Sequence, residues 1–147
     1  MTATTATTAM TDTNGAKVFI VEDEDNIALA LTTVLGREGW QLTRIADGAA
    51  ALEAIRAERP NLVILDVMLP SLSGYEICQR IRLEESLADT RILMMTARGT
   101  SVERRKGLAL GADGFISKPF DLRELMGEAR RLLERSGPLY VEARGDA

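Results

Sequence analysis

Short apolar runs that alternate with helical patterns constrain the fold of this chain more than any other feature. The run LVIL at 62–65 is apolar at every position, which is typical of a strand buried on both faces of a sheet. Strands that alternate with helices form parallel sheets through right-handed crossovers. The pattern therefore predicts one α/β domain with a parallel sheet of five strands, at residues 17–21, 40–46, 62–65, 91–95 and 115–117.

Helical periodicity fills the segments between these runs and the segment after the last one. It predicts five helices, at residues 27–35, 49–58, 75–83, 101–110 and 122–136. We expect the folded domain to span residues 16–136. Residues 1–15 are rich in Thr and Ala and are expected to form a disordered tail, and 137–147 a short C-terminal tail.

Composition excludes several kinds of chemistry. The chain has 147 residues, a net charge of −4 and no histidine, so His bases, His metal ligands and Ser–His or Cys–His pairs are absent. Its single cysteine, Cys78, cannot form an internal disulfide, which favours a reducing, cytoplasmic location. The acidic balance and the lack of a long apolar run predict no direct contact with nucleic acid or membrane.

The ends of the predicted strands carry the polar residues of interest. Glu22 and Asp23 follow the first strand, Asp66 the third, Thr96 the fourth and Lys118 the fifth. The carboxyl ends of parallel strands meet at one edge of the sheet, where ligands bind. We therefore expect these side chains to share one pocket.

Three neighbouring carboxylates need positive counter-charges, because two charges 4 Å apart repel by about 4 kcal/mol at an effective dielectric of 20. Carboxylate oxygens suit Mg²⁺, and Lys118 offers a second positive charge. Thr96 adds a hydroxyl donor. A metal ion, an ammonium and a hydroxyl around one carboxylate can hold a phosphoryl group.

Each of these residues has an ordinary structural explanation when taken alone. Asp25 in the acidic run fits a helix N-cap, and Asp66 could cap the turn that follows its strand. Lys118 could lie at the surface, and Thr96 could be a common strand residue. Their joint position at four strand ends favours a functional site.

Four motifs carry a resemblance to a known family. They are VEDED at 21–25, LDVMLP at 65–70, MTAR at 95–98 and GADGFISKPF at 111–120. In this order and spacing, the chain resembles the receiver domain of bacterial two-component response regulators. The resemblance implies a flavodoxin-like, doubly wound sheet with strand order 2-1-3-4-5.

The resemblance also implies a role for each pocket residue. Asp66 would accept a phosphoryl group, with Mg²⁺ held by Glu22, Asp23, Asp66 itself and the backbone carbonyl of Met68. The peptide Lys118–Pro119 would be cis and would direct the lysine inward.

The same resemblance implies switch and tuning residues. Thr96 would bond the phosphoryl oxygen and Lys118 would pair with it, while Phe115 would be an aromatic switch that turns inward after phosphorylation. Met68 and Arg98 flank the pocket and would slow attack by water on the phosphorylated form.

These implications describe a regulatory protein rather than an enzyme. The phosphoryl donor would be a histidine kinase or a histidine phosphotransfer protein. The chain would act as a single-domain, phosphorylation-activated switch, signalling to an unknown protein through the face of helix 101–110, strand 115–117 and the last helix.

Gly107 inside helix 101–110 costs about 1 kcal/mol relative to alanine and predicts local softness. Gly114 and Glu128 depart from the family's charged dimer pattern, so we expect a monomer or a weak dimer.

Three alternatives remain open. The chain could be the receiver part of a winged-helix DNA-binding regulator, or a phosphate sink or relay intermediate. It could also be an Asp-nucleophile phosphatase of the haloacid dehalogenase type. That mechanism needs a second aspartate where this chain has Met68.

Overall fold

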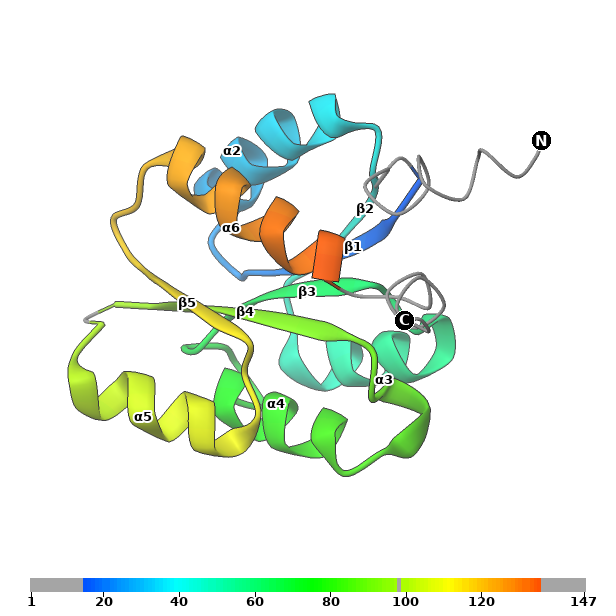
Figure 1. Cartoon of the computed structure of the whole chain (residues 1–147), viewed down its shortest axis with the longest axis vertical. Helices are drawn as coiled ribbons and strands as arrows, with labels where there is room; N and C mark the ends of the chain where they lie inside the picture. Colours follow the sequence, from blue (N-terminus) through cyan, green and yellow to red (C-terminus); the bar gives the residue numbers. More distant parts are fainter. Residues whose placement is uncertain (1–14, 98, 136–147) are drawn as a thin grey trace.

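The computed structural model describes residues 15–97 and 99–135, which form a five-stranded sheet. The sheet lies between two helical layers (Figure 1). All neighbouring strands are parallel, and their order is β2-β1-β3-β4-β5. The predicted α/β class and strand order are confirmed. The strands are β1 (Lys17–Val21), β2 (Gln41–Ile45), β3 (Leu62–Asp66), β4 (Arg91–Thr96) and β5 (Gly114–Ser117).

Five α-helices in the described part of the chain cover the two faces of the sheet. Helices α2 and α6 lie on one face, and α3, α4 and α5 lie on the other (Figure 1). Short 3-10 turns, η1 (Gly36–Glu38) and η2 (Glu85–Leu87), follow α2 and α4. The helices are α2 (Asp25–Leu35), α3 (Gly48–Glu58), α4 (Gly74–Arg82), α5 (Ser101–Leu110) and α6 (Leu122–Arg135).

The central position of β3 explains why its first four residues, 62–65, are all apolar. Leu62 and Ile64 pack into the core beneath α2 and α6, whereas Val63 and Leu65 pack into the core on the opposite face. All five residues of the strand are buried. Asp66, the last of them, pairs in register with Met95 of β4 and so reaches the carboxyl edge of the sheet.

Helix starts differ in how they are capped. Ser73 and Glu76 form a reciprocal capping box at α4, and Asp47 caps α3 by accepting from the amide of Ala50. Helix α2 has no such side-chain cap, because its N-cap residue Glu24 makes no capping bond. Asp25, for which a capping role was one interpretation, is instead the first residue of the helix.

The predicted tails fall almost wholly outside the described residues. Of residues 1–15 the structure describes Gly15, and it describes none of 137–147. In the part of the chain that is described, no helix combines the length and the apolar character needed to cross a membrane.

Candidate functional site

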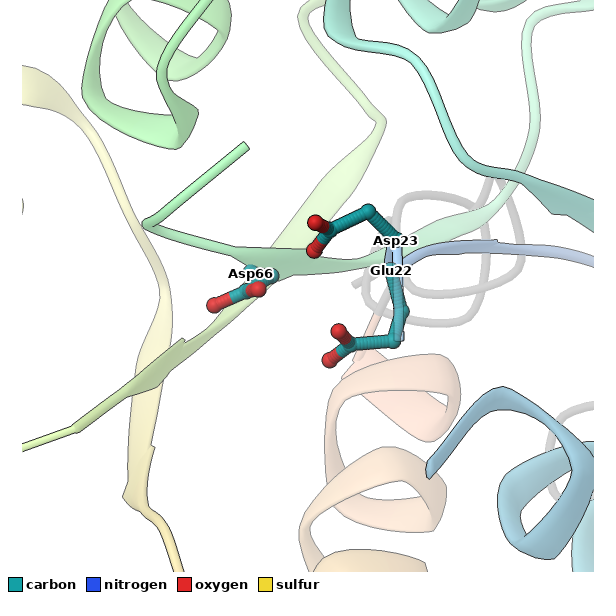
Figure 2. A group of neighbouring side chains, drawn as sticks. All are labelled: Glu22, Asp23 and Asp66. Atoms are coloured by element: carbon teal, nitrogen blue, oxygen red, sulfur yellow. The ribbon is translucent and has the colours of Figure 1, made fainter. Parts of the chain in front are cut away.

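Three carboxylates meet at the carboxyl edge of the sheet, where β1 and β3 end side by side. Ligand oxygens of Glu22, Asp23 and Asp66 lie within 4.8 Å of one another. Figure 2 shows the three side chains close together. Glu22 and Asp66 are buried, and Asp23 is exposed to solvent. A set of hard oxygen donors that is open on one side fits a Mg²⁺ ion that keeps part of its water shell.

Lys118 brings a positive charge to the same carboxylates. Its Nζ atom lies 2.9 Å from Oε1 of Glu22 and 3.3 Å from Oδ2 of Asp66. Burial alone would lower the pKa of Lys118, but its bond to Glu22 and the charges of Asp66 and Glu22 raise that pKa overall. The ammonium is therefore fully charged at neutral pH. The Lys118–Pro119 peptide is cis, as the resemblance implied.

Asp66 is harder to ionise than an ordinary aspartate. Its burial and the negative charge of Glu22 raise the pKa of Asp66 to about 6, against the opposing charge of Lys118. The backbone amide of Met68 donates to its Oδ1 over 3.3 Å, which also favours the ionised form. At neutral pH the carboxylate is mostly ionised, and a bound cation would make it more so.

Four interactions fix the position of Glu22. Its Oε1 binds Lys118, and its Oε2 accepts from the amide of Glu24 over 3.0 Å. Its own amide donates to the carbonyl of Ile45 over 3.1 Å, and its carbonyl accepts from Nε of Arg44 over 2.9 Å. This buried glutamate therefore has little freedom to leave the site.

Thr96 places a buried hydroxyl at the end of β4, the strand that pairs with β3. The residue is 1% exposed, and within residues 15–97 and 99–135 its Oγ1 has no hydrogen-bond partner. Its carbonyl accepts from the amide of Lys118 over 2.7 Å, which couples the ends of β4 and β5. A buried hydroxyl without a partner is rare in proteins and fits a site for a group with oxygen acceptors.

Phe115 lies one strand away, and its ring packs against the backbone of α5. A Cβ atom on Gly107 would lie 2.0 Å from Cζ of Phe115, so the glycine leaves space that the ring occupies. The ring is half-buried beside the core beneath α3, α4 and α5, and the guanidinium of Arg104 lies 6.0 Å from its centre. The ring therefore contacts α5 in this structure, and its role as a switch stays a prediction.

The tuning roles of Met68 and Arg98 stay predictions. The side chain of Met68 is 71% exposed, two residues after Asp66. Arg98 lies outside the described residues.

Sequence reasoning missed two contacts at the site. Gly107 was visible as a glycine inside a helix, but the sequence suggested only softness and gave no sign of the Phe115 ring. Arg44 had no local signal, because its bond to Glu22 depends on how β2 pairs with β1.

Comparison with known proteins identifies the family. The sequence profile of the response regulator receiver domain matches residues 18–130. The chain belongs to this family. Receiver domains of this kind are the regulated components of two-component signalling.

One curated relative is the transcriptional regulatory protein CseB of Streptomyces coelicolor. It is 42% identical over 120 residues, which cover 82% of this chain and 50% of the relative. The receiver chain spans about half the length of the curated relatives it matches.

Solved structures agree with the fold. The chemotaxis protein CheY4 of Vibrio cholerae has a TM-score of 0.75 and 30% identity, covering 80% of this chain and 98% of that one. The receiver domain of the sensor histidine kinase PA1611 of Pseudomonas aeruginosa has a TM-score of 0.70 and 28% identity, covering 81% and 98%. That structure contains a magnesium ion in its active-site cleft.

Proposed function

We propose that this receiver domain is a phosphorylation-activated switch that accepts a phosphoryl group on Asp66 from a phosphohistidine. The donor would be a histidine kinase or a histidine phosphotransfer protein, since the chain itself has no histidine. One observation carries the proposal: Nζ of Lys118 lies within 3.3 Å of carboxylate oxygens of both Asp66 and Glu22. At the end of the neighbouring strand β4, the buried hydroxyl of Thr96 has no hydrogen-bond partner among the described residues. This arrangement offers charge and hydrogen bonding to a phosphoryl group on Asp66.

The transfer step follows from these positions. An ionised oxygen of Asp66 bonds to phosphorus as the N–P bond of the phosphohistidine breaks, and the imidazole nitrogen keeps the electron pair. Lys118, now 3.3 Å from Asp66, can then pair with the phosphoryl oxygens. Mg²⁺, when bound, would neutralise charge on those oxygens. Glu22, Asp23, Asp66 and the carbonyl of Met68 would hold it.

The added charge supplies the signal. An aspartyl phosphate brings close to two negative charges and new acceptor oxygens into the pocket. The hydroxyl of Thr96 can satisfy its missing hydrogen bond by moving toward them, and the β4–α5 loop would follow. Phe115 would respond to that movement through its packing between β4 and α5.

We further propose that the output surface is the face formed by α5, β5 and α6. A groove of about 480 Å³ lies there, lined in part by Arg104, Leu108, Phe115 and Arg131. Leu108 is exposed, which suits contact with a protein partner. Glu128 pairs with Arg131 of its own helix over 2.7 Å, which supports a monomer or a weak dimer rather than a strong charged dimer.

A second candidate function is the receiver half of a transcriptional regulator. Relatives bearing that description are about twice as long as the segment they share with this chain. Recovery of the complete coding region would test this, because a following winged-helix domain would make DNA binding the output.

The central test is intact mass after incubation with Mg²⁺ and a small phosphodonor. We expect the wild type to gain about 80 Da, the mass of one phosphoryl group. Asp66→Asn should gain nothing, and Asp89→Asn, at an exposed aspartate in the turn before β4, should behave as wild type. Unchanged labelling of Asp66→Asn would refute the proposal.

The same samples separate the remaining alternatives. We expect slow loss of the phosphoryl group, because the long side chains of Met68 and Arg98 would hinder an attacking water. Continuous release of phosphate over many turnovers would instead indicate a phosphatase. A phosphate sink would show no protein partner that binds better when beryllofluoride mimics the phosphorylated state.

A further inference from the structure

We propose that Arg44 is a positioning residue for the cation site, a role that rests on the proposed function. Arg44 lies in β2, at the edge of the sheet, and reaches across to the β1–α2 loop that carries Asp23. Its guanidinium holds this loop at two points, one on each side of Asp23. The effect is to keep the Asp23 carboxylate beside Asp66.

The two bonds come from a single rigid group. Nε of Arg44 donates to the carbonyl of Glu22 over 2.9 Å, and Nη2 donates to Oδ1 of Asp25 over 2.9 Å. Because the guanidinium is planar, the spacing between its nitrogens is fixed. The two bonds therefore restrain the distance between the Glu22 peptide and the start of α2.

Asp23 depends on this external support. Among the described residues, no hydrogen bond reaches its carboxylate, so the backbone on either side sets its position. The following helix does not help, because α2 lacks a side-chain cap at Glu24. The two bonds from Arg44 restrain the loop in place of a capping side chain.

The two bonds are unequal in strength. Asp25 is 90% exposed, so its ion pair with Arg44 is weakened by water. The bond to the Glu22 carbonyl is partly buried, and the amide of Glu22 is itself bound to Ile45 of β2. Both polar groups of the Glu22 backbone are thus held by the edge strand.

Positioning and charge make opposite predictions for Mg²⁺ affinity. A positive guanidinium near three carboxylates repels a cation, so its removal would tighten Mg²⁺ binding if charge alone mattered. If Arg44 positions Asp23, its removal weakens binding, because the ligand oxygens are no longer held together. The sign of the change therefore decides between the two roles.

The test is calorimetric titration of the metal-free full chain with Mg²⁺ alone. We expect Arg44→Gln to weaken Mg²⁺ binding about tenfold, the lower end of what losing a supporting group costs a metal site. Arg44→Lys keeps the charge but has one nitrogen, so it should also bind Mg²⁺ more weakly than wild type. Arg80→Gln, which removes the same charge from the exposed side of α4, should bind as wild type does.

A second measurement needs no metal. In metal-free protein, the amide of Glu24, now bonded to the side chain of Glu22, should exchange with solvent faster in Arg44→Gln. Thermal unfolding should stay within the range of the Arg80→Gln control, which separates local positioning from general stability. If Arg44→Gln does not fold, the Mg²⁺ affinity of Arg44→Lys decides whether Arg44 positions the site.

The outcomes are distinct. Equal or tighter Mg²⁺ binding in the Arg44 variants overturns the positioning role and leaves the proposed function intact. A wild type that binds no Mg²⁺ and gains no phosphoryl group on Asp66 overturns both.

Discussion

Asp66 is the residue on which the proposed chemistry depends, and its neighbours act on its ionisation in opposite directions. Burial and the neighbouring Glu22 disfavour its charge, while Lys118 and the Met68 amide favour it. Ionising Asp66 in the folded protein therefore costs some stability. A phosphoryl group or a cation would change that balance directly.

This cost predicts that the free energies of unfolding of wild type and Asp66→Asn differ by an amount that depends on pH. Between pH 3.8 and about 6 the native state binds more protons at Asp66 than the unfolded state does, so stability from this group falls as pH rises. Above pH 6, Asp66→Asn should be more stable than wild type by about 1–3 kcal/mol, since one unit of pKa shift is about 1.4 kcal/mol. Below pH 3.8, the ordinary pKa of an aspartate, the two proteins should be equally stable.

Urea unfolding in a chelating buffer at several pH values measures this difference. Asp89→Asn, at an exposed aspartate, should show no such trend. A gap between Asp66→Asn and wild type that does not vary with pH would contradict the prediction.

Thr96 offers a second test at the scale of one residue. Among the described residues its buried hydroxyl has no hydrogen-bond partner, so Thr96→Val should leave the free energy of unfolding unchanged or raise it by about 1 kcal/mol. Thr90 is a matched control, because its buried hydroxyl donates to the carbonyl of Pro60 over 2.9 Å. Thr90→Val should destabilise the protein by about 1–3 kcal/mol, since it leaves that carbonyl unpaired.

Both threonine variants can be compared by denaturant unfolding. In the Thr96→Val variant, beryllofluoride should no longer change the NMR signals of the Phe115 ring, although Asp66 should still accept a phosphoryl group. Equal destabilisation by the two substitutions would show that Thr96 has a partner in the unmodified protein.

At the scale of elements, the contact between α5 and β5 explains the glycine inside a helix. Gly107 has no Cβ, and Phe115 fills that space under the guanidinium of Arg104. The helix accepts a residue of low helix propensity because the packing of the aromatic ring requires it. Gly107 therefore has a packing role, and the local softness of α5 stays a prediction.

Gly107→Ala should destabilise the protein although alanine is the better helix former. The gain in helix propensity is about 1 kcal/mol, but a Cβ placed 2.0 Å from Cζ of Phe115 forces the ring to move. Overpacking of this kind costs about 1–3 kcal/mol. Gly127→Ala in α6 is the matched control, because nothing lies within 4 Å of its Cβ position.

Thermal or urea unfolding of both alanine variants gives the answer. Gly127→Ala should be stabilised by up to about 1 kcal/mol. If Gly107→Ala were stabilised equally, the ring would not depend on the glycine.

At the scale of the whole molecule, the cation site joins segments that are distant in the sequence, so it exists only in the folded state. Mg²⁺ should therefore stabilise the native protein, by about 1.4 kcal/mol when its concentration is ten times its Kd. Asp23→Asn removes one ligand and should lose most of this gain. Unfolding curves at matched ionic strength, with NaCl replacing MgCl₂, separate binding from charge screening.

An Asp23→Asn protein that kept the full Mg²⁺ effect would show that the ion binds elsewhere. Asp89→Asn should keep the effect, since Asp89 is an exposed residue outside the cluster.

Much of this molecule was determined by local sequence pattern. The apolar run at 62–65 in β3 required a sheet covered on both faces, and parallel strands place their carboxyl ends at one edge. That is why Glu22, Asp66 and Lys118 could be predicted to meet although they are far apart in the chain.

The tertiary structure alone decided how these groups interact. Lys118 bridges Glu22 and Asp66, Arg44 fastens the acidic loop, and Phe115 rests on Gly107. Periodicity is a property of neighbouring residues and fixes which face is buried. Contacts between side chains on different elements depend on strand register and helix packing, which no single segment of sequence encodes.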